Sequence, residues 1–108
     1  MIKYSDKNIT LKEGKVTRNI RTTRTDKIHP VQQMGTVTIE DGGEIPYHVA
    51  EYDEVYLVLS GDLACNDNGQ EDVLHPEDSL ICKKGESCGF QNKSGVTVEM
   101  MEFIFYRN

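Results

Sequence analysis

His48, Glu54 and Tyr56 lie at even spacing in one short stretch, so an extended backbone would point all three to the same side. Ser60 shares their parity and would join them unless a turn or bulge intervenes. A carboxylate that faces a protein interior needs a partner, because burial without one is costly and raises its pKa. A raised pKa would suit Glu54 to acid–base catalysis, and a structural, hydrogen-bonded glutamate is the equal alternative. His48 has a structural alternative too, a hydrogen bond to Glu54 or Tyr52.

The three cysteines, Cys65, Cys82 and Cys88, are an odd number at irregular spacing and do not describe a disulfide framework. Reduced thiols fit better and predict a cytoplasmic protein. The first ten residues contain no apolar h-region of a signal peptide, and no apolar run approaches the roughly 18 residues of a membrane span. We therefore expect no membrane contact, and the net charge of −6 argues against nucleic acid as a partner.

The elements that must position these residues are predicted to be strands. A chain of 108 residues is long enough for a single domain with its own core. Beyond Glu40, short apolar or alternating segments are separated by turn signals about every 8–12 residues, which is the pattern of a sandwich or barrel. We expect residues 34–108 to form this barrel and residues 1–33 to form an N-terminal arm or first strands. The expected strands cover residues 35–40, 55–59, 62–65, 78–82 and 96–106.

The N-terminal segment carries a regular series of basic residues. Its stretch from residue 16 to 28 is rich in β-branched residues and threonine, which favours extended or irregular chain over helix. We expect the basic side chains to be solvated, to blunt a strand edge, or to lie against the acidic body of this chain or of a partner. That acidic body runs between Ile28 and Cys82, where there is no Lys or Arg. The basic series is Lys12, Lys15, Arg18, Arg21, Arg24 and Lys27.

The run from Val55 to Leu59 is apolar on both pleat faces, so both faces should be covered. In so small a barrel, a second subunit would cover the outer face. We therefore expect a homodimer in which residues 1–33 contribute to the contact.

Two spaced motifs resemble those of the cupin family. The first runs from Gly43 to Gly61 and in cupins contains two histidines one residue apart, followed by a glutamate. His48 and Glu54 match this motif, and Ala50 stands where the second histidine would be. The resemblance implies an all-β, cupin-type double-stranded β-helix, which is a small jelly-roll barrel.

The second motif lies between residues 76 and 92, and Cys88 stands in it where cupins have a histidine. A complete cupin site holds a metal with three imidazoles and one carboxylate, so the resemblance leaves His48, Glu54 and Cys88 as possible ligands here. Three protein ligands with one open position are enough for a catalytic zinc-type site, and a thiolate favours zinc over Mn or Mg. Tyr52 and Tyr56 are then expected to line the ligand pocket. The structural alternative for Cys88 is a small apolar core residue.

A narrower resemblance joins the segment Tyr52–Leu63 and the turn at Lys84–Ser87 to the ethanolamine-utilisation Q proteins. Those cupins lack the full metal tetrad and are associated with bacterial ethanolamine breakdown in microcompartments. This resemblance implies a cytoplasmic, microcompartment-associated accessory or catabolic protein that binds a small molecule, with no certain cofactor.

Three functional classes therefore remain open. The first is a ligand-binding cupin of the ethanolamine-utilisation Q type. The second is a metal-dependent isomerase, lyase or dioxygenase that uses His48, Glu54 and Cys88, with Glu54 as the catalytic residue. The third is a dimeric sensor or structural module without catalysis.

Overall fold

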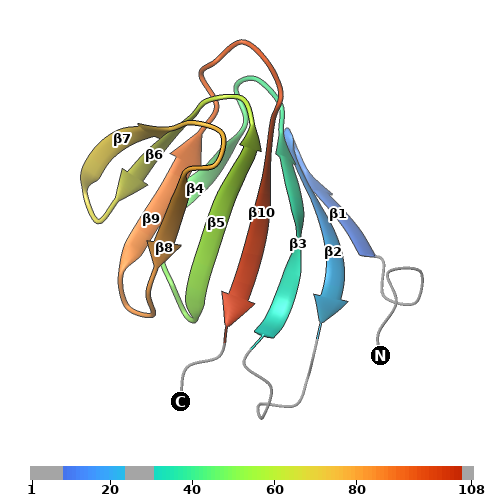
Figure 1. The fold of residues 1–108 in the computed structure, drawn as a ribbon, viewed down its shortest axis with the longest axis vertical. Helices are drawn as coiled ribbons and strands as arrows, with labels where there is room; N and C mark the ends of the chain where they lie inside the picture. The colour runs from blue at the N-terminus through green and yellow to red at the C-terminus, as the bar shows by residue number, and fades with distance from the viewer. Residues whose placement is uncertain (1–8, 24–30, 106–108) are drawn as a thin grey trace.

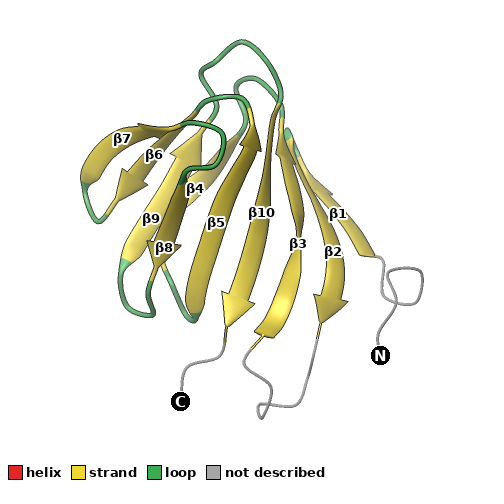
Figure 2. Cartoon of the chain, viewed as in Figure 1, coloured by secondary structure: helices red, strands yellow, loops and turns green. Residues whose placement is uncertain are grey.

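The computed structural model describes residues 9–23 and 31–105, and their regular structure is entirely β-strand (Figures 1 and 2). Ten strands form two sheets in which every pairing is antiparallel. This confirms the prediction of an all-β jelly-roll barrel in a single domain. No helix in the described ranges is long and apolar enough to cross a membrane.

The larger sheet has six strands in the order β1-β2-β3-β10-β5-β8. In Figure 1, β1 and β2 lie at the side of the molecule away from the smaller sheet. The strands are β1 (Ile9–Glu13), β2 (Val16–Thr23), β3 (Val31–Ile39), β5 (Asp53–Ser60), β8 (Ser79–Cys82) and β10 (Val98–Phe105).

The smaller sheet has four strands in the order β4-β9-β6-β7 and packs across β5 and β8. Its strands are β4 (Glu44–Val49), β6 (Leu63–Asp67), β7 (Gln70–Leu74) and β9 (Ser87–Gln91). The five strands predicted from the sequence correspond to β3, β5, β6, β8 and β10.

The N-terminal segment contributes β1 and β2, which extend the larger sheet beyond β3. Residues 1–8 and 24–30 of that segment lie outside the described residues. Its contribution to a dimer contact stays a prediction.

Strand β5 shows how alternation builds the core. Tyr56 and Val58 are buried between the sheets, whereas Leu57 faces outward and is half-buried. Ser60 does not follow its parity and is exposed. Val58 pairs with Met100 and Ser60 with Glu99, so Leu59 is an extra residue, and this bulge turns Ser60 to the outer face.

Candidate functional site

His48, Glu54 and Cys88 meet between the two sheets. His48 on β4 lies directly opposite Cys88 on β9, and Glu54 reaches them from β5 of the other sheet. The expectation that His48 and Glu54 share one strand face is therefore wrong. The chain reverses at residues 50–52, so the two side chains face each other across the barrel.

A bulge in β4 places His48. The register between β4 and β9 shifts between Ile45 and His48, so both residues point inward although they are three positions apart. Gly89 allows this shift, because a Cβ there would lie 2.8 Å from the Tyr47 backbone nitrogen. The missing side chain of β9 thus lets the β4 backbone carry the imidazole to the cluster.

Glu54 is the acceptor at the centre of the cluster. Its Oε1 lies 2.9 Å from His48 Nε2 and 2.7 Å from the hydroxyl of Tyr56, which donates to it. The thiol of Cys88 donates to the same oxygen at a Sγ–Oε1 distance of 3.7 Å. Ligand atoms of His48, Glu54 and Cys88 all lie within 4.8 Å of one another.

The second ring nitrogen of His48 fixes the state of the first. Nδ1 lies 2.8 Å from the carbonyl oxygen of Pro46, and a carbonyl can only accept, so Nδ1 carries a proton. Nε2 then either carries a second proton, which it donates to Glu54, or offers its lone pair to a cation. A backbone carbonyl behind a ligating imidazole is a recurrent arrangement in metal sites.

The pKa values fit this arrangement. Burial lowers the pKa of His48, but the hydrogen bonds to Pro46 and Glu54 outweigh it, and the pKa is raised overall. Burial, followed by the charges of Glu102 and Glu54, strongly raises the pKa of Tyr56, so its hydroxyl stays a donor. Burial next to Cys82 strongly raises the pKa of Cys88, which is therefore a thiol unless a cation stabilises the thiolate.

Two further ionisable residues of the barrel were not among the predicted site residues. Glu102 on β10 is only 5% exposed and lies opposite Tyr56, and Arg18 on β2 places Nε 3.5 Å from Glu102 Oε1. Burial raises the pKa of Glu102 more than Arg18 lowers it. Alternation was the available signal, because Arg18 lies between the buried Val16 and Ile20.

The remaining predicted site residue, Tyr52, lies in the connection between β4 and β5 and is 39% exposed. Its role in ligand binding stays a prediction. Cys82, expected to be structural, is a buried free thiol that lies opposite Glu54 and contributes to the raised pKa of Cys88.

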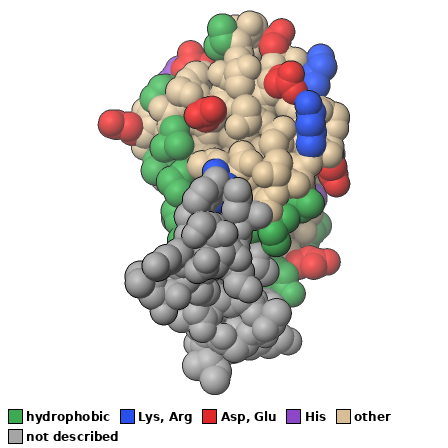
Figure 3. Space-filling model, turned by 90° about the vertical axis from the view of Figure 1, so that its right-hand side faces the viewer, with side chains coloured by type: hydrophobic (Ala, Val, Ile, Leu, Met, Phe, Trp, Pro, Cys, Tyr) green, Lys and Arg blue, Asp and Glu red, His purple; other side chains and the backbone are tan. Residues whose placement is uncertain are grey.

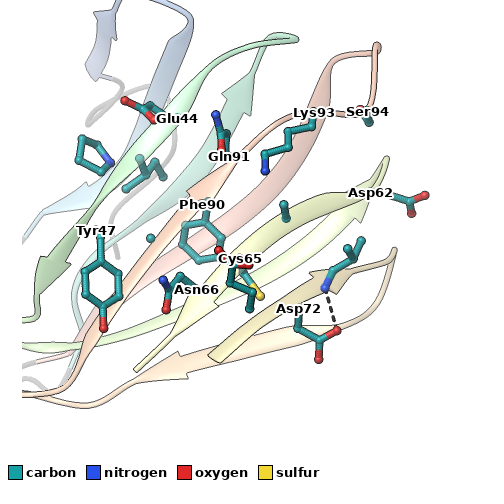
Figure 4. A pocket seen from close by; sticks show the side chains of 16 residues that line it. Glu44, Tyr47, Asp62, Cys65, Asn66, Asp72, Phe90, Gln91, Lys93 and Ser94 are labelled. Atoms are coloured by element: carbon teal, nitrogen blue, oxygen red, sulfur yellow. Dashed lines mark hydrogen bonds between the residues drawn. The ribbon is translucent and has the colours of Figure 1, made fainter. Parts of the chain in front are cut away.

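A larger hollow, of about 690 Å³, lies on the outer face of the smaller sheet. Figure 4 shows Tyr47 at one side of it and Asp62 and Asp72 at the other, with Gln91 and Lys93 above the strands. Its lining includes none of the three residues of the inner cluster. The hollow and the cluster are separate features on opposite sides of the smaller sheet.

The inner donor set fits a zinc-type ion. One imidazole nitrogen, one carboxylate and one thiol converge, and this leaves a fourth position for water or a ligand. Removal of the Cys88 proton and the proton shared by His48 and Glu54 would turn the three hydrogen-bonded groups into three ligands.

One comparison with known proteins identifies a family. The family model described as "Cupin domain" matches residues 35–104. A comparison with curated protein sequences finds no match.

Solved structures resemble the whole chain at low sequence identity. A predicted oxalate decarboxylase from Thermotoga maritima is 18% identical, with a TM-score of 0.82 and 99% of both chains covered. An RmlC-like cupin from Shewanella frigidimarina is 15% identical, with a TM-score of 0.80 and coverage of 99% of this chain and 91% of that one. KdgF from a Halomonas species is 18% identical, with a TM-score of 0.74 and coverage of 93% and 88%. Such likeness shows the shared fold.

Proposed function

Because the chain belongs to the cupin family, we propose that its barrel binds a small molecule at a zinc-type centre held by His48, Glu54 and Cys88. The observation that carries this proposal is the orientation of His48. Its Nδ1 proton is directed to Pro46, which leaves Nε2 facing a carboxylate and a thiol. Soft and borderline donors of this kind favour zinc over magnesium or manganese.

A bound ion of this type would polarise a ligand oxygen or lower the pKa of a bound water. The residues of the chain perform the positioning. Tyr56 holds Glu54 by its hydroxyl, and Pro46 holds the imidazole of His48. In the enzymatic form of the proposal, Glu54 exchanges a proton with the ligand, and an isomerase, lyase or dioxygenase would use the site in this way. In the non-catalytic form, the same cluster makes a sensor or binding module.

The pathway role that we propose is that of the ethanolamine-utilisation Q type. It rests on the similarity of Tyr52–Leu63 and Lys84–Ser87 to that family. An accessory or catabolic protein of a bacterial pathway, in the cytoplasm and associated with a microcompartment, is the corresponding expectation. The names of the structural neighbours include a predicted oxalate decarboxylase and KdgF, so the barrel as such supports no single reaction.

Metal content tests the centre. Protein purified without chelator should contain close to one equivalent of zinc by elemental analysis, and Glu54→Gln, which keeps the shape but removes the charge, should lose it. Glu44→Gln, an exposed residue of the outer hollow, is the matched control and should retain the metal. Substitution with cobalt adds a second measurement, because a thiolate–cobalt absorption band should appear and be absent in Cys88→Ser. Equal metal content in Glu54→Gln and Glu44→Gln would contradict the proposal.

We also propose that the chain forms a homodimer through the outer face of the larger sheet. Ile81 is 56% exposed there and lies beside Val55, which in turn pairs with Phe103. Figure 3, which views the molecule from the side of β1 and β2, shows hydrophobic side chains gathered along its margins. A second copy would cover the apolar outer surface around Ile81, Val55 and Phe103.

Sedimentation tests the dimer. Ile81→Glu should dissociate it at micromolar concentration, whereas Val73→Glu, at an exposed apolar position on the other sheet, should not. Deletion of residues 1–25 should also weaken the dimer. A wild-type monomer at micromolar concentration would refute the assembly.

A further inference from the structure

We propose that Arg18 is an anion-binding residue of the barrel and that the ligand is a small carboxylate. The inference rests on the proposed function, because it concerns a ligand in the same barrel, but it involves strands outside both family motifs. Arg18 is on β2 and its partner Glu102 is on β10.

The first support is the placement of the guanidinium. Arg18 lies between the buried residues Val16 and Ile20, so its side chain points to the inner face of the larger sheet. It is partly buried, whereas the lysines of the described ranges are all exposed. A partly buried guanidinium can bind a carboxylate with two parallel hydrogen bonds, which makes it a geometrically specific carboxylate binder.

The second support is that the ion pair between Arg18 and Glu102 is weak. Their contact joins Nε to one carboxylate oxygen at 3.5 Å, whereas charge-assisted hydrogen bonds lie near 2.7–2.9 Å. Tyr56 lies opposite Glu102, but its hydroxyl proton is donated to Glu54, so Arg18 is the charged partner of Glu102. A guanidinium has five N–H donors, so Arg18 can bind a ligand carboxylate through its terminal nitrogens while Nε stays beside Glu102.

The third support is the path that connects Arg18 to the inner cluster. Tyr56 lies beside Glu102 and donates to Glu54, which is in contact with His48. A short ligand whose carboxylate lies on Arg18 would direct its other end to the cluster.

The fourth support is access from solvent. Leu11 on β1 lies directly opposite Arg18, on the same inner face, and is 51% exposed. Figure 1 shows β1 and β2 at the side of the larger sheet that the smaller sheet does not reach. The inner face is therefore open beside Arg18, and a ligand can approach the guanidinium without disrupting the core.

The test is a thermal-shift screen with the zinc-loaded and the chelator-treated protein. The probes are two- to six-carbon mono- and dicarboxylates, each paired with its neutral amide. At least one acid should raise the unfolding midpoint while its amide does not, because only a ligand of the folded state stabilises it. Calorimetry then gives the dissociation constant of that acid.

Variants separate binding from structure. Arg18→Gln alone would leave the buried carboxylate of Glu102 without its cation. The double variant Arg18→Gln/Glu102→Gln removes both charges together and leaves no unpaired charge in the barrel. It should bind the acid at least about tenfold more weakly, which is the loss expected for hydrogen bonds to a charged group. Glu102→Gln alone should bind as tightly as the wild type or more tightly, and Arg21→Gln, a charge-matched control on the same strand, should bind as the wild type does.

The outcomes distinguish this inference from the proposed function. Retained acid binding in the double variant, a preference for amides, or no acid that raises the midpoint would overturn the role of Arg18. A protein that binds the acid through Arg18 but contains no metal would overturn the zinc-type centre alone. The double variant should retain its metal, since neither residue belongs to the cluster of His48, Glu54 and Cys88.

Discussion

The two sides of the smaller sheet differ in what they contain. On the inner side, Glu54 and Cys88 are buried and the thiol donates to the carboxylate. On the outer side lies a hollow of about 690 Å³ in which Tyr47 is 53% exposed. Polar groups cost free energy when they are buried and almost none when water still reaches them. The buried interior, rather than the outer hollow, is therefore where the fold stabilises an unfavourable arrangement of charges.

This difference has an energetic consequence. Groups in the inner cluster depend on one another, because Glu54 accepts from three donors on three strands. Removal of one member leaves buried partners without a hydrogen bond, and this costs more than the bond contributed. Groups in the outer hollow exchange each lost contact for water. Paired substitutions on the two sides should thus differ in size.

The largest difference is expected for a pair of glutamates. Glu54→Ala should lower the free energy of unfolding by about 3–5 kcal/mol, because it leaves the His48, Tyr56 and Cys88 groups without their acceptor. Glu44→Ala, at an exposed position of the outer hollow, should change it by less than about 0.5 kcal/mol. Urea unfolding of chelator-treated protein measures both. Equal losses would show that the inner cluster is not a coupled network.

Gly89 belongs to both sides, because it lines the outer hollow and also allows the bulge that positions His48. Substitution there should cause an intermediate loss in the free energy of unfolding. A Cβ at Gly89 would lie 2.8 Å from both the nitrogen and the Cα of Tyr47, so Gly89→Ala must displace the bulge that carries His48. We expect a loss of about 1–3 kcal/mol, typical of overpacking, together with weaker metal binding.

Gly69→Ala provides the comparison, since nothing lies within 4 Å of a Cβ there, although its positive φ adds backbone strain. It should leave the metal content unchanged. Normal metal binding by Gly89→Ala would mean that the bulge does not position His48.

The strands and the inward face of β5 could be predicted from the alternation of apolar residues and the spacing of turn residues. Tyr56 and Val58 are buried and Leu57 is not, as the pattern required. The position of His48 could not be derived in this way. The reversal at residues 50–52 contains no glycine or proline, and the bulge in β4 depends on Gly89 of another strand. Only the family motif correctly predicted that His48 and Glu54 meet. The structure shows that the chain reversal and the bulge in β4 place them there.

Arg18 and Glu102 illustrate a different limit. Both alternate with buried apolar residues, so their parity placed them inside. Charged residues are nevertheless almost always outside unless they are paired. A single sequence does not show the pairing, because β2 and β10 are both neighbours of β3 and the two side chains meet across it. The prediction that the basic series lies against the acidic body between Ile28 and Cys82 is not tested by this pair, because Glu102 lies outside that stretch.

The pH dependence of stability should reveal Glu102. Its pKa in the folded protein lies above the ordinary value of about 4.3, so the folded state binds the proton more tightly than the unfolded chain. The stability that this provides is fully present below the ordinary value and is lost as the pH rises through the folded pKa. Relative to Glu102→Gln, the wild type should lose up to about 1.4 kcal/mol per pH unit in that window.

The measurement is the difference between the unfolding free energies of these two proteins from pH 4 to 8, with chelator present. Other titrating groups cancel in the difference. A wild type that gains stability over the variant as the pH rises would mean that Arg18 outweighs burial, and the carboxylate would then be a satisfied ion-pair partner.

The smallest effect should come from the outer hollow itself. Gln91 lies on the outer face of β9, between two buried residues that hold the strand in place, and it lines the hollow. Gln91→Ala should change the free energy of unfolding by less than about 0.5 kcal/mol and should leave metal content and acid binding unchanged. Urea unfolding, elemental analysis and the acid screen together measure this. If Gln91→Ala lost acid binding while Arg18→Gln/Glu102→Gln still bound the acid, the ligand site would lie on the outer face of the smaller sheet. Free volume would then be the better guide to the site, and the buried charges would be structural.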